Sequence, residues 1–568
     1  MRAAFTRRLA AFSLCLLACG ALPAQAPGEE AASARLPGYF QGFDPRVPTQ
    51  ESYKDWPSRE LLERLFGRSW GPRSFRRAAL FDQPVLFVLT VDWSRSAQRL
   101  ATETLRDPEV VHALNQAYIL VVANADLRPD LRERYQSGSW PVVAFLLPDG
   151  NPMLARVGEP EERPISAGAV DAKTLKFLLD EGAVYWNKRR TDLRQGGLRW
   201  AREAKPLAPK AAPADAALSD LMARWMLGNA DTLDGGFGVA PKFVIDGLDR
   251  YATLREARGL DDLRPHARLT LEALLRSPLY DAREGGAHRL ATAPSFGGIR
   301  YEKLLTVNAT LIRELVSSLE REDSKPLRNA LARTADFMMK TLGRAEGGFY
   351  LAQAADPRSD DGGGYSRDGR GEAPPVDALL LSAPNARAGA ALIQAGKLLA
   401  DDELVRAGRA ALDLVLEAAV TRGRGVGHVI APVADPRVYL QTQAETALGL
   451  LDGYGATGEG GYLDAAQEIV DFVRANLKDP KDSLYQDHLA STRSIGLLAG
   501  ERRPLRANVR LARAMVGLAR HGRGDLYRRE AAALLGAMAG ELQESGVQGT
   551  EAALAIEELL ALPAAVED

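Results

Sequence analysis

From residue 214 to the C-terminus, stripes of apolar residues spaced three and four apart alternate with loops that carry paired glycines. The stripes at 311–319, 412–419 and 534–538 have the period of amphipathic helices. A glycine pair suits a helix end followed by a tight loop. Such pairs stand at 235–236, 285–286, 347–348 and 460–461. This length fits twelve helices at about 30 residues per helix and loop. We therefore predict an all-α (α/α)6 six-hairpin toroid over 214–568, with its functional pocket where the loops converge at one mouth.

Residues 53–190 show a different pattern, in which apolar runs alternate with helical spacing. The runs at 84–92, 118–123 and 141–147 suit strands that are covered on both faces. Asp149-Gly150 then predicts a hairpin turn. These features indicate a small α/β layer domain. A Pro/Ala-rich stretch within 191–213 predicts a linker to the toroid.

The first 26 residues have the layout of an export signal: three arginines, an apolar stretch at 9–22, and small residues at Ala24 and Ala26. A second reading is a lipoprotein signal, because Leu16-Leu17-Ala18-Cys19 resembles a lipobox whose Cys19 would be acylated. Both readings place the protein outside the cytoplasm, in the periplasm or lipid-anchored to the cell envelope, with 27–52 as a tether. No later segment reaches the roughly 20 apolar residues of a membrane-spanning helix.

The two cysteines of the chain are Cys15 and Cys19, both inside or at the edge of this signal. We therefore expect no thiol in the mature domains, which argues against disulfides, cysteine-ligated zinc and thiol catalysis. The six histidines lack metal-ligand spacing, and no phosphate-binding loop motif occurs, so no metal and no cofactor are expected. A formal net charge of −2 without long like-charge runs argues against nucleic-acid binding.

Short motifs in both halves of the chain resemble the spermatogenesis-associated protein twenty family, which pairs a thioredoxin-like domain with a glycosidase-like toroid. The matching motifs are Arg128-Pro129-Asp130, Trp140-Pro141, Pro148-Asp149-Gly150, GGFGVAPKF at 235–243, GGAHR at 285–289, and Glu302-Lys303-Leu304-Leu305 with Asn308. They extend over most of the chain, from about residue 70 to residue 535. The resemblance implies an α/β thioredoxin-like domain followed by the six-hairpin toroid.

The chain departs from this family at the redox motif. Where the family carries C-H-W-C, this sequence has Ser94-Arg95-Ser96-Ala97. A thioredoxin site needs a cysteine whose pKa is lowered at a helix N-terminus, and a serine hydroxyl cannot ionise there without an adjacent base. Ser94, Ala97 and Pro141 therefore mark a degenerate redox site. We expect Ser94 to be a helix cap rather than a nucleophile, and Pro141 to be either a bare fold element or part of a vestigial peptide groove.

The toroid motifs have also changed, because family polar positions fall on Arg300, Val307, Ala354 and Ala383. The carboxylates retained in matched motifs are Glu302 and Asp356, and His288 follows a glycine pair. Glycoside hydrolysis needs two carboxylates, and His288 could serve as an acid or base. The alternatives are an ion pair of Glu302 with Lys303 and a loop brace for His288. Candidate ligand-binding residues lie in or beside the same motifs: Phe237, Lys242, Phe243, Arg289, Tyr301, Asn308, Tyr350 and Asn385.

These features favour an exported, redox-inactive protein whose toroid binds a carbohydrate or peptide-like ligand. The first alternative is a glycoside hydrolase or sugar epimerase that uses Glu302, Asp356 and His288. The second is a two-domain scaffold that docks a partner protein. The fold alone does not select among them, because toroids of this kind host several chemistries.

Overall fold

The computed structural model describes residues 68–136, 138–156, 162–203, 210–356, 373–430, 437–489 and 494–563. The expected signal and tether, with Cys19, lie outside these ranges. The chain divides into two compact units. Unit 1 comprises residues 1–206 with 490–502, and unit 2 comprises 207–489 with 503–568. The segment 490–502 therefore belongs to the first unit, although it follows most of the second in sequence.

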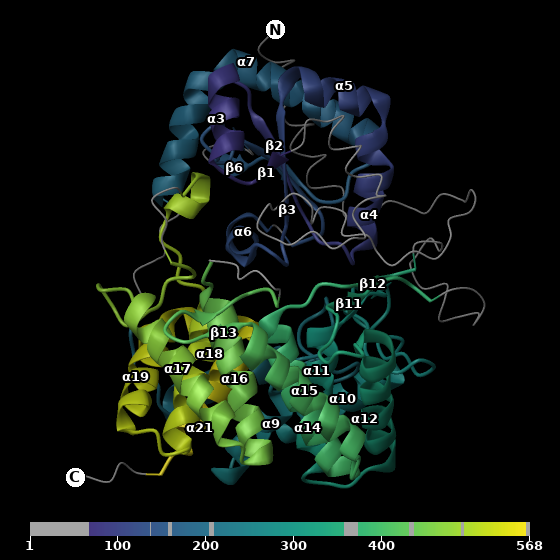
Figure 1. The fold of residues 1–568 in the computed structure, drawn as a ribbon, viewed down its shortest axis with the longest axis vertical. Coiled ribbons are helices and arrows are strands. Elements are labelled where there is room, and N and C mark those ends of the chain that lie inside the picture. Colours follow the sequence, from purple (N-terminus) through teal and green to yellow (C-terminus); the bar gives the residue numbers. More distant parts are fainter. Residues whose placement is uncertain are drawn as a thin grey trace. The chain divides into compact units, whose positions relative to one another are not determined.

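Unit 1 contains a five-stranded sheet with the order β1-β3-β2-β4-β7 (Figure 1). Strands β1, β3 and β2 run parallel, whereas β4 and β7 run antiparallel to their neighbours. The strands are β1 (Arg68–Ser69), β2 (Val85–Thr90), β3 (Ile119–Asn124), β4 (Val142–Leu146) and β7 (Ser166–Ala167). The predicted thioredoxin-like α/β fold is confirmed by this strand order together with the covering helices.

Helices cover both faces of this sheet, which explains why β2 and β3 are buried along their whole length. One face packs on α4, α5 and α7, and the other carries Trp70, Phe75 and Tyr135 beside α3 and α6. The helices are α3 (Pro72–Phe81), α4 (Arg95–Thr102), α5 (Pro108–Ala117), α6 (Pro129–Tyr135) and α7 (Ala172–Glu203). Helix α7 kinks at Arg189 and extends through the first half of the region expected to be a linker.

The Asp149-Gly150 turn follows β4, as expected, but only a bridge between Leu146 and Pro152 continues the hairpin. The next strand, β5 (Leu154–Arg156), pairs with β6 (Glu162–Pro164) instead. This region of unit 1 also binds residues 494–502, which contact the turn and helix α6. Gly496 N donates to Asp149 O at 3.1 Å, and the Arg134 Nε donates to Leu497 O at 2.9 Å.

Unit 2 is a ring of helical hairpins, so the predicted all-α (α/α)6 toroid is confirmed. Among the described residues, six inner helices contact one another in a closed cycle, and each packs most extensively on one outer helix (Figure 1). The inner helices, in ring order, are α9 (Leu248–Ala257), α11 (Leu305–Leu319), α14 (Ser382–Leu399), α16 (Leu440–Thr457), α18 (Leu505–Arg520) and α21 (Thr550–Leu560). Their outer partners are α10 (Arg264–Arg276), α12 (Lys325–Phe337), α15 (Asp402–Ala418), α17 (Gly460–Asn476), α19 (Asp525–Ala537) and α8 (Ala216–Gly228). The ring closes because α8, the first helix, packs against α21, the last.

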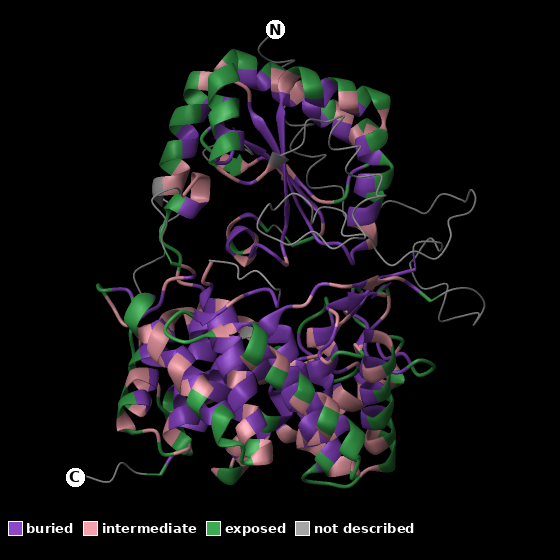
Figure 2. Ribbon diagram, viewed as in Figure 1, coloured by how far each residue is buried: buried purple, intermediate pink, exposed green. Residues whose placement is uncertain are grey.

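The inner helices are buried over most of their surface, whereas the outer helices are buried on one side only (Figure 2). Loops that lead into the inner helices are long and contain short strand pairs, such as β10 (Lys303–Leu304) with β11 (Ala352–Gln353). Loops that leave α9, α11, α14, α16 and α18 are short, as at 258–263 and 320–324. The toroid thus has a long-loop end and a short-loop end. One expectation was wrong: Gly460-Gly461 lies in the first turn of α17, not in a long loop.

Candidate functional site

Four amide side chains near the starts of inner helices hold the long loops in place. We call Asn308, Asn385, Gln443 and Asn508 the amide clasps. Asn385 accepts from Phe349 N at 2.7 Å and donates to Phe349 O at 3.1 Å and Leu381 O at 3.0 Å. Each of the other three accepts from the backbone N–H of one loop residue and donates to the carbonyl of that same residue. The loop residues are Ala287, Val426 and Tyr485. Their side chains are buried and occupied by backbone partners.

The clasps explain the second glycine of two predicted pairs. Gly286 and Gly348 have positive φ angles of 80° and 78°. A Cβ atom on Gly286 would lie 2.6 Å from Asn308 Oδ1, and one on Gly348 would lie 3.1 Å from Asn385 Oδ1. Glycine therefore supplies both the backbone conformation and the space that the clasp needs.

Two buried lysines brace long loops by pairing with an aspartate and a glycine carbonyl, one in the loop that Asn308 holds and one in the loop at 231–238. The Lys303 Nζ lies 2.6 Å from Asp281 Oδ2 and donates to Gly285 O at 2.9 Å. Lys242 makes the equivalent contacts with Asp231 at 2.7 Å and Gly235 O at 2.8 Å. The predicted ligand-binding residues Lys242, Asn308 and Asn385 therefore contact the protein's own loops.

The structure brings Glu302, His288 and Arg289 together in one loop region. Glu302 is paired, as the structural alternative expected, but its partner is Arg289 at 3.2 Å rather than Lys303. The His288 Nδ1 lies 3.0 Å from Tyr301 O, and its ring meets the Tyr301 ring edge to face at 5.0 Å. Burial, followed by the charge of Lys303, lowers the pKa of His288 to about 4. His288 is therefore neutral at pH 7.

The remaining predicted residues make other contacts, and Tyr350 and Asp356 flank the strand β11 that pairs with β10 beside Glu302. The Phe237 ring meets His266 at 4.8 Å, and Tyr350 lies under Arg344. Phe243 packs against the core cluster of the inner helices, and Asp356 is buried. Asp356 and Glu302 remain predictions as a catalytic pair.

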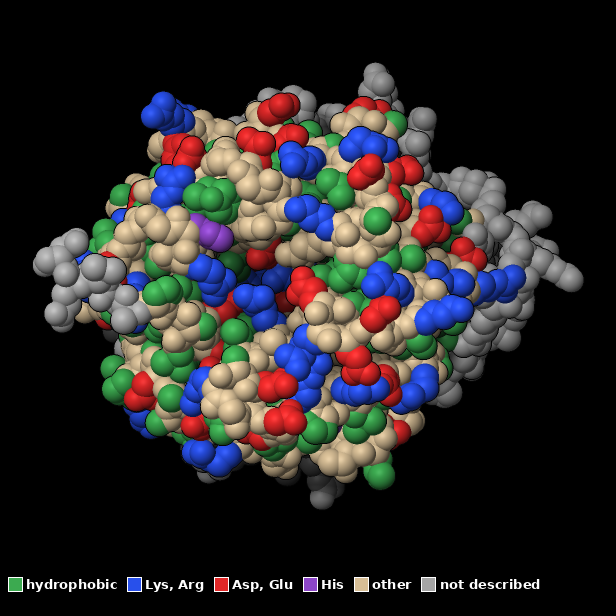
Figure 3. All heavy atoms as spheres, turned by 90° about the horizontal axis from the view of Figure 1, so that it is seen from below, with side chains coloured by type: hydrophobic (Ala, Val, Ile, Leu, Met, Phe, Trp, Pro, Cys, Tyr) green, Lys and Arg blue, Asp and Glu red, His purple; other side chains and the backbone are tan. Residues whose placement is uncertain are grey.

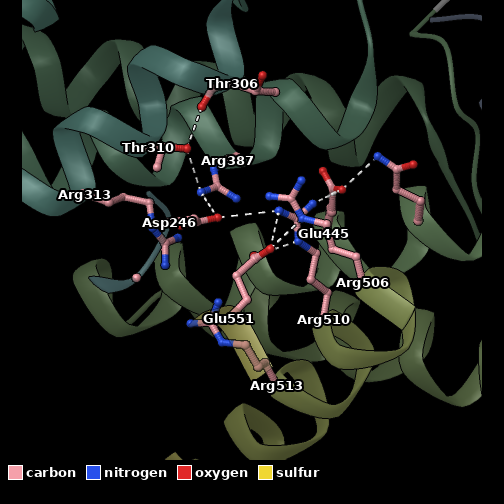
Figure 4. A network of polar contacts seen from close by, with 12 residues as sticks. Asp246, Thr306, Thr310, Arg313, Arg387, Glu445, Arg506, Arg510, Arg513 and Glu551 are labelled. Atoms are coloured by element: carbon pink, nitrogen blue, oxygen red, sulfur yellow. Dashed lines mark hydrogen bonds and ion pairs between the residues drawn. The ribbon is translucent and has the colours of Figure 1, made fainter. Parts of the chain in front are cut away.

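A cluster that the sequence analysis missed lies on the axis of the toroid. Positions two residues before and after a clasp lie on the opposite side of an α-helix, because two residues turn the helix by about 200°. The clasps contact the loops, so these positions point away from the loops. Figure 4 shows Arg387, Glu445 and Arg510 pointing toward one another. The axial mouth is formed by the residues that lie two positions before a clasp, namely Thr306, Gln441 and Arg506. The residues that lie two positions after a clasp are one helical turn deeper, and they are Thr310, Arg387, Glu445 and Arg510.

The deeper layer is an ion network, the axial charge network, that joins five inner helices and the start of α9. Its members are Asp246, Arg313, Arg387, Glu445, Arg510, Arg513, Glu551 and Glu558 (Figure 4). Arg510 binds Glu551 with two hydrogen bonds of 2.9 and 3.1 Å and also pairs with Glu445. Arg513 binds Glu558 with bonds of 2.9 and 3.2 Å. Paired charges of this kind keep one another ionised in the interior.

The electrostatics of the network follow from burial and pairing. Burial acts to raise the pKa of Glu558, but Arg513 and its hydrogen bonds outweigh it and hold that pKa at about 2. Glu314, at the edge of the network, has no cationic partner of this kind. Burial raises the pKa of Glu314 to about 8, against the backbone N–H groups of Gly247 and Asp249 that it accepts from.

Solvent reaches the axial mouth but scarcely reaches the layer below. The exposed fraction of the side chain falls from 66% at Arg506 to 6% at Arg510, one helical turn deeper. Gln441 donates to Glu445 Oε1 at 3.0 Å, and Arg506 Nε donates to Glu551 Oε2 at 2.6 Å. The mouth therefore presents amide and guanidinium groups that are held by carboxylates from below, beside the hydroxyl of Thr306.

The degenerate redox site lies at one edge of the unit 1 sheet. Leu89 near the end of β2 is opposite Val142 at the start of β4. Ser94 therefore follows the end of β2, and Pro141 precedes the start of the neighbouring strand β4. The Trp140–Pro141 peptide bond is cis. Ser94 occupies the N-cap position of α4, but its hydroxyl makes no capping hydrogen bond. Ala97, on the first turn of α4, is buried.

Comparison with known proteins identifies the first unit. Residues 63–204 match the family model Thioredox_DsbH, described as a protein of unknown function, DUF255. Spermatogenesis-associated protein 20 of Rattus norvegicus is 22% identical over 312 residues, which cover 52% of this chain and 39% of the rat protein. The chain is therefore similar to spermatogenesis-associated protein 20 over about half of its length. It is also 23% identical to the uncharacterized protein B0495.5 of Caenorhabditis elegans over 306 residues, 50% of this chain and 41% of that one. The matches thus span about two fifths of the length of these relatives.

Among solved structures, a sugar epimerase from a ruminal bacterium aligns with a TM-score of 0.45 and 13% identity, covering 56% of this chain and 85% of that one. Cellobiose 2-epimerase from Spirochaeta thermophila DSM 6192 gives 0.45 and 15%, with 61% and 85% covered. Within the described ranges, no helix is long and apolar enough to cross a membrane. In the same residues, no cluster of three or more His, Cys, Asp or Glu side chains could hold a metal ion.

Proposed function

We propose that this chain is an exported, redox-inactive member of its family whose toroid binds a neutral carbohydrate at the axial mouth. The observation that carries the proposal is that Thr306, Gln441 and Arg506 occupy the same position, two residues before a clasp, on three inner helices above a buried layer of paired charge. Sugar hydroxyls both donate and accept hydrogen bonds. They therefore match a surface on which amide, guanidinium and carboxylate groups alternate.

The balance of charge favours a neutral ligand over an ionic one. Three guanidinium groups near the mouth, those of Arg387, Arg506 and Arg510, face three carboxylates of the network. Those carboxylates are Asp246, Glu445 and Glu551. A charged ligand would disturb this balance in a partly desolvated site, whereas a sugar hydroxyl would bridge a cation and an anion at little electrostatic cost.

Redox inactivity is supported by the residues at the start of α4. Ser94 and Ala97 stand where the family carries its thiols, and neither side chain can form a disulfide or a thiolate. The export signal at 1–26 supports a location in the periplasm or on the cell envelope.

Replacing Gln441 by Ala tests the carbohydrate proposal. The variant loses the amide that faces the mouth, so we expect at least a tenfold weaker Kd for the best ligand in a panel of neutral mono- and disaccharides, measured by titration calorimetry. Gln467→Ala, on outer helix α17, is the matched control and should bind as the parent does. Absence of binding across the panel, or equal binding by Gln441→Ala, would refute the proposal.

The same panel separates binding from the alternative of glycoside hydrolase or epimerase activity. Turnover of a sugar that disappears in Glu302→Gln would favour catalysis by Glu302 with His288 and Asp356. The observation that keeps this alternative open is the placement of His288 and Glu302 in one loop region, and the lowered pKa of His288 makes its imidazole a weak base there.

A further inference from the structure

A stripe of arginines runs along α18 on the side that faces the axis. Arg506, Arg510, Arg513 and Arg520 are spaced by four, three and seven residues, which keeps them on one helical face. The neighbouring helix α21 carries two acidic residues opposite this stripe, Glu551 and Glu558, and ends at Leu560. The first three arginines pair with these acids. The side chain of Arg520 makes no hydrogen bond or ion pair with any residue that the structure describes, although the charges of Glu558 and Asp452 act on it.

Arg520 belongs to a group of charges at the short-loop end of the axis. The Arg250 Nε lies 3.1 Å from Glu558 Oε1, where Arg513 is also bound. Arg313 pairs with Asp452. This group therefore contains two carboxylates, those of Asp452 and Glu558, and four guanidinium groups. The guanidinium groups are those of Arg250, Arg313, Arg513 and Arg520, so two positive charges in the group have no neutralising partner within it.

This end of the toroid is open to solvent. Figure 3 views the molecule from the side on which the short loops lie and shows a hollow near the middle, with both Lys or Arg and Asp or Glu side chains along its edge. The side chains of Arg250, Asp452 and Arg313 are 44%, 28% and 17% exposed. A ligand can therefore reach these groups, while the paired network closes the axis behind them.

The surroundings of Arg520 explain why an anion would be favourable there. Burial, together with the charges of Arg250 and Arg513, lowers the pKa of Arg520, although Glu558 acts in the opposite direction. Like charges held together in a hollow repel one another and raise the local concentration of anions. An added anion would relieve this repulsion.

We propose that the hollow at the short-loop end is an anion site for a dianionic phosphate group, which Arg250 and Arg520 bind with support from Arg313. Two negative charges match the two uncompensated positive charges. Planar guanidinium groups also suit the paired oxygens of phosphate. The site lies at the opposite end of the axis from the carbohydrate site and does not depend on it.

The test is the substitution Arg520→Gln, which removes one unpaired cation from the described structure and should leave the melting temperature without ligand unchanged. Inorganic phosphate and a hexose 6-phosphate are titrated calorimetrically into the parent protein, with chloride at equal ionic strength as the reference. We expect saturable binding of at least one phosphate compound and at least a tenfold weaker Kd in Arg520→Gln. Arg529→Gln, an exposed arginine on outer helix α19, is the matched control and should retain binding.

The relative affinities identify the source of the phosphate group. Equal binding of both probes indicates free phosphate, and tighter binding of the hexose 6-phosphate indicates a phosphorylated sugar. Arg250→Gln gives an independent check, because it should also weaken binding. The proposal is overturned if neither compound binds better than chloride, or if Arg520→Gln and Arg250→Gln both bind as the control does.

Discussion

Replacing Arg510 by Met is expected to lower the free energy of unfolding by about 3–5 kcal/mol, the range typical of a buried ion pair that loses one partner. Arg510 is the central cation of the axial charge network and contacts Glu551, Glu445 and Asp246. The substitution keeps most of the side-chain volume but leaves these carboxylates with too little positive charge. Denaturant unfolding at pH 7 measures the loss.

The loss should also depend on pH. Burial acts to raise the pKa of Glu445, and Arg510 is the main group that lowers it. Without Arg510 the folded-state pKa rises above its unfolded value, so protonation at pH 5 relieves part of the penalty and ionisation at pH 8 increases it. Arg529→Met, which removes an exposed pair with Asp525 at 2.6 Å, should cost less than about 1 kcal/mol at either pH. A loss below 1 kcal/mol in Arg510→Met would contradict the ion network as described.

Replacing Asn385 by Ala should destabilise the toroid by about 3 kcal/mol, because the backbone N–H and C=O of Phe349 lose a buried partner at a cost of about 1–3 kcal/mol for each group left unsatisfied. The carbonyl of Leu381 loses one donor but keeps the backbone N–H of residue 385. The measurement is again denaturant unfolding, with carbohydrate affinity determined in parallel.

Asn476→Ala is the control for this substitution. Asn476 is exposed on α17 and makes one hydrogen bond, from its Nδ2 to Phe472 O at 2.8 Å. Its loss should change stability by about 0.5 kcal/mol or less. If Asn385→Ala kept full stability and lost carbohydrate binding, Asn385 would be a ligand-binding residue, as the sequence predicted, rather than a clasp.

The fold could be predicted from the sequence because its signals are local. Apolar stripes with helical spacing gave the toroid helices, and the fully apolar runs gave β2, β3 and β4. The exceptions depend on contacts between distant segments. Nothing near residue 496 in the sequence indicates that Gly496 packs beside Asp149 in unit 1, more than 300 residues away in sequence. Similarly, local spacing did not distinguish Gly460-Gly461 in a helix from the pairs in loops.

The candidate site was predicted less well, because its residues were chosen from loop motifs that resemble the family, and the deeper turns of the inner helices were not considered. Lys242 and Asn308 stand in those motifs, but their side chains brace loops. A signal for the axis was nevertheless present in the sequence. Arg387, Glu445 and Arg510 interrupt apolar helices at the same offset from Asn385, Gln443 and Asn508. Charges at one repeated position of otherwise apolar helices indicate a shared polar interior, but only the closed ring shows that they meet.

We propose that this chain has lost thiol chemistry and that its toroid binds a ligand. Insulin reduction by dithiothreitol, followed as turbidity, tests the loss of thiol chemistry most directly. The protein should carry Cys15→Ser and Cys19→Ser, so that no cysteine remains in the sequence. We predict a rate equal to that of the buffer blank at every protein concentration. A rate that rises with the concentration of this cysteine-free protein would contradict the account.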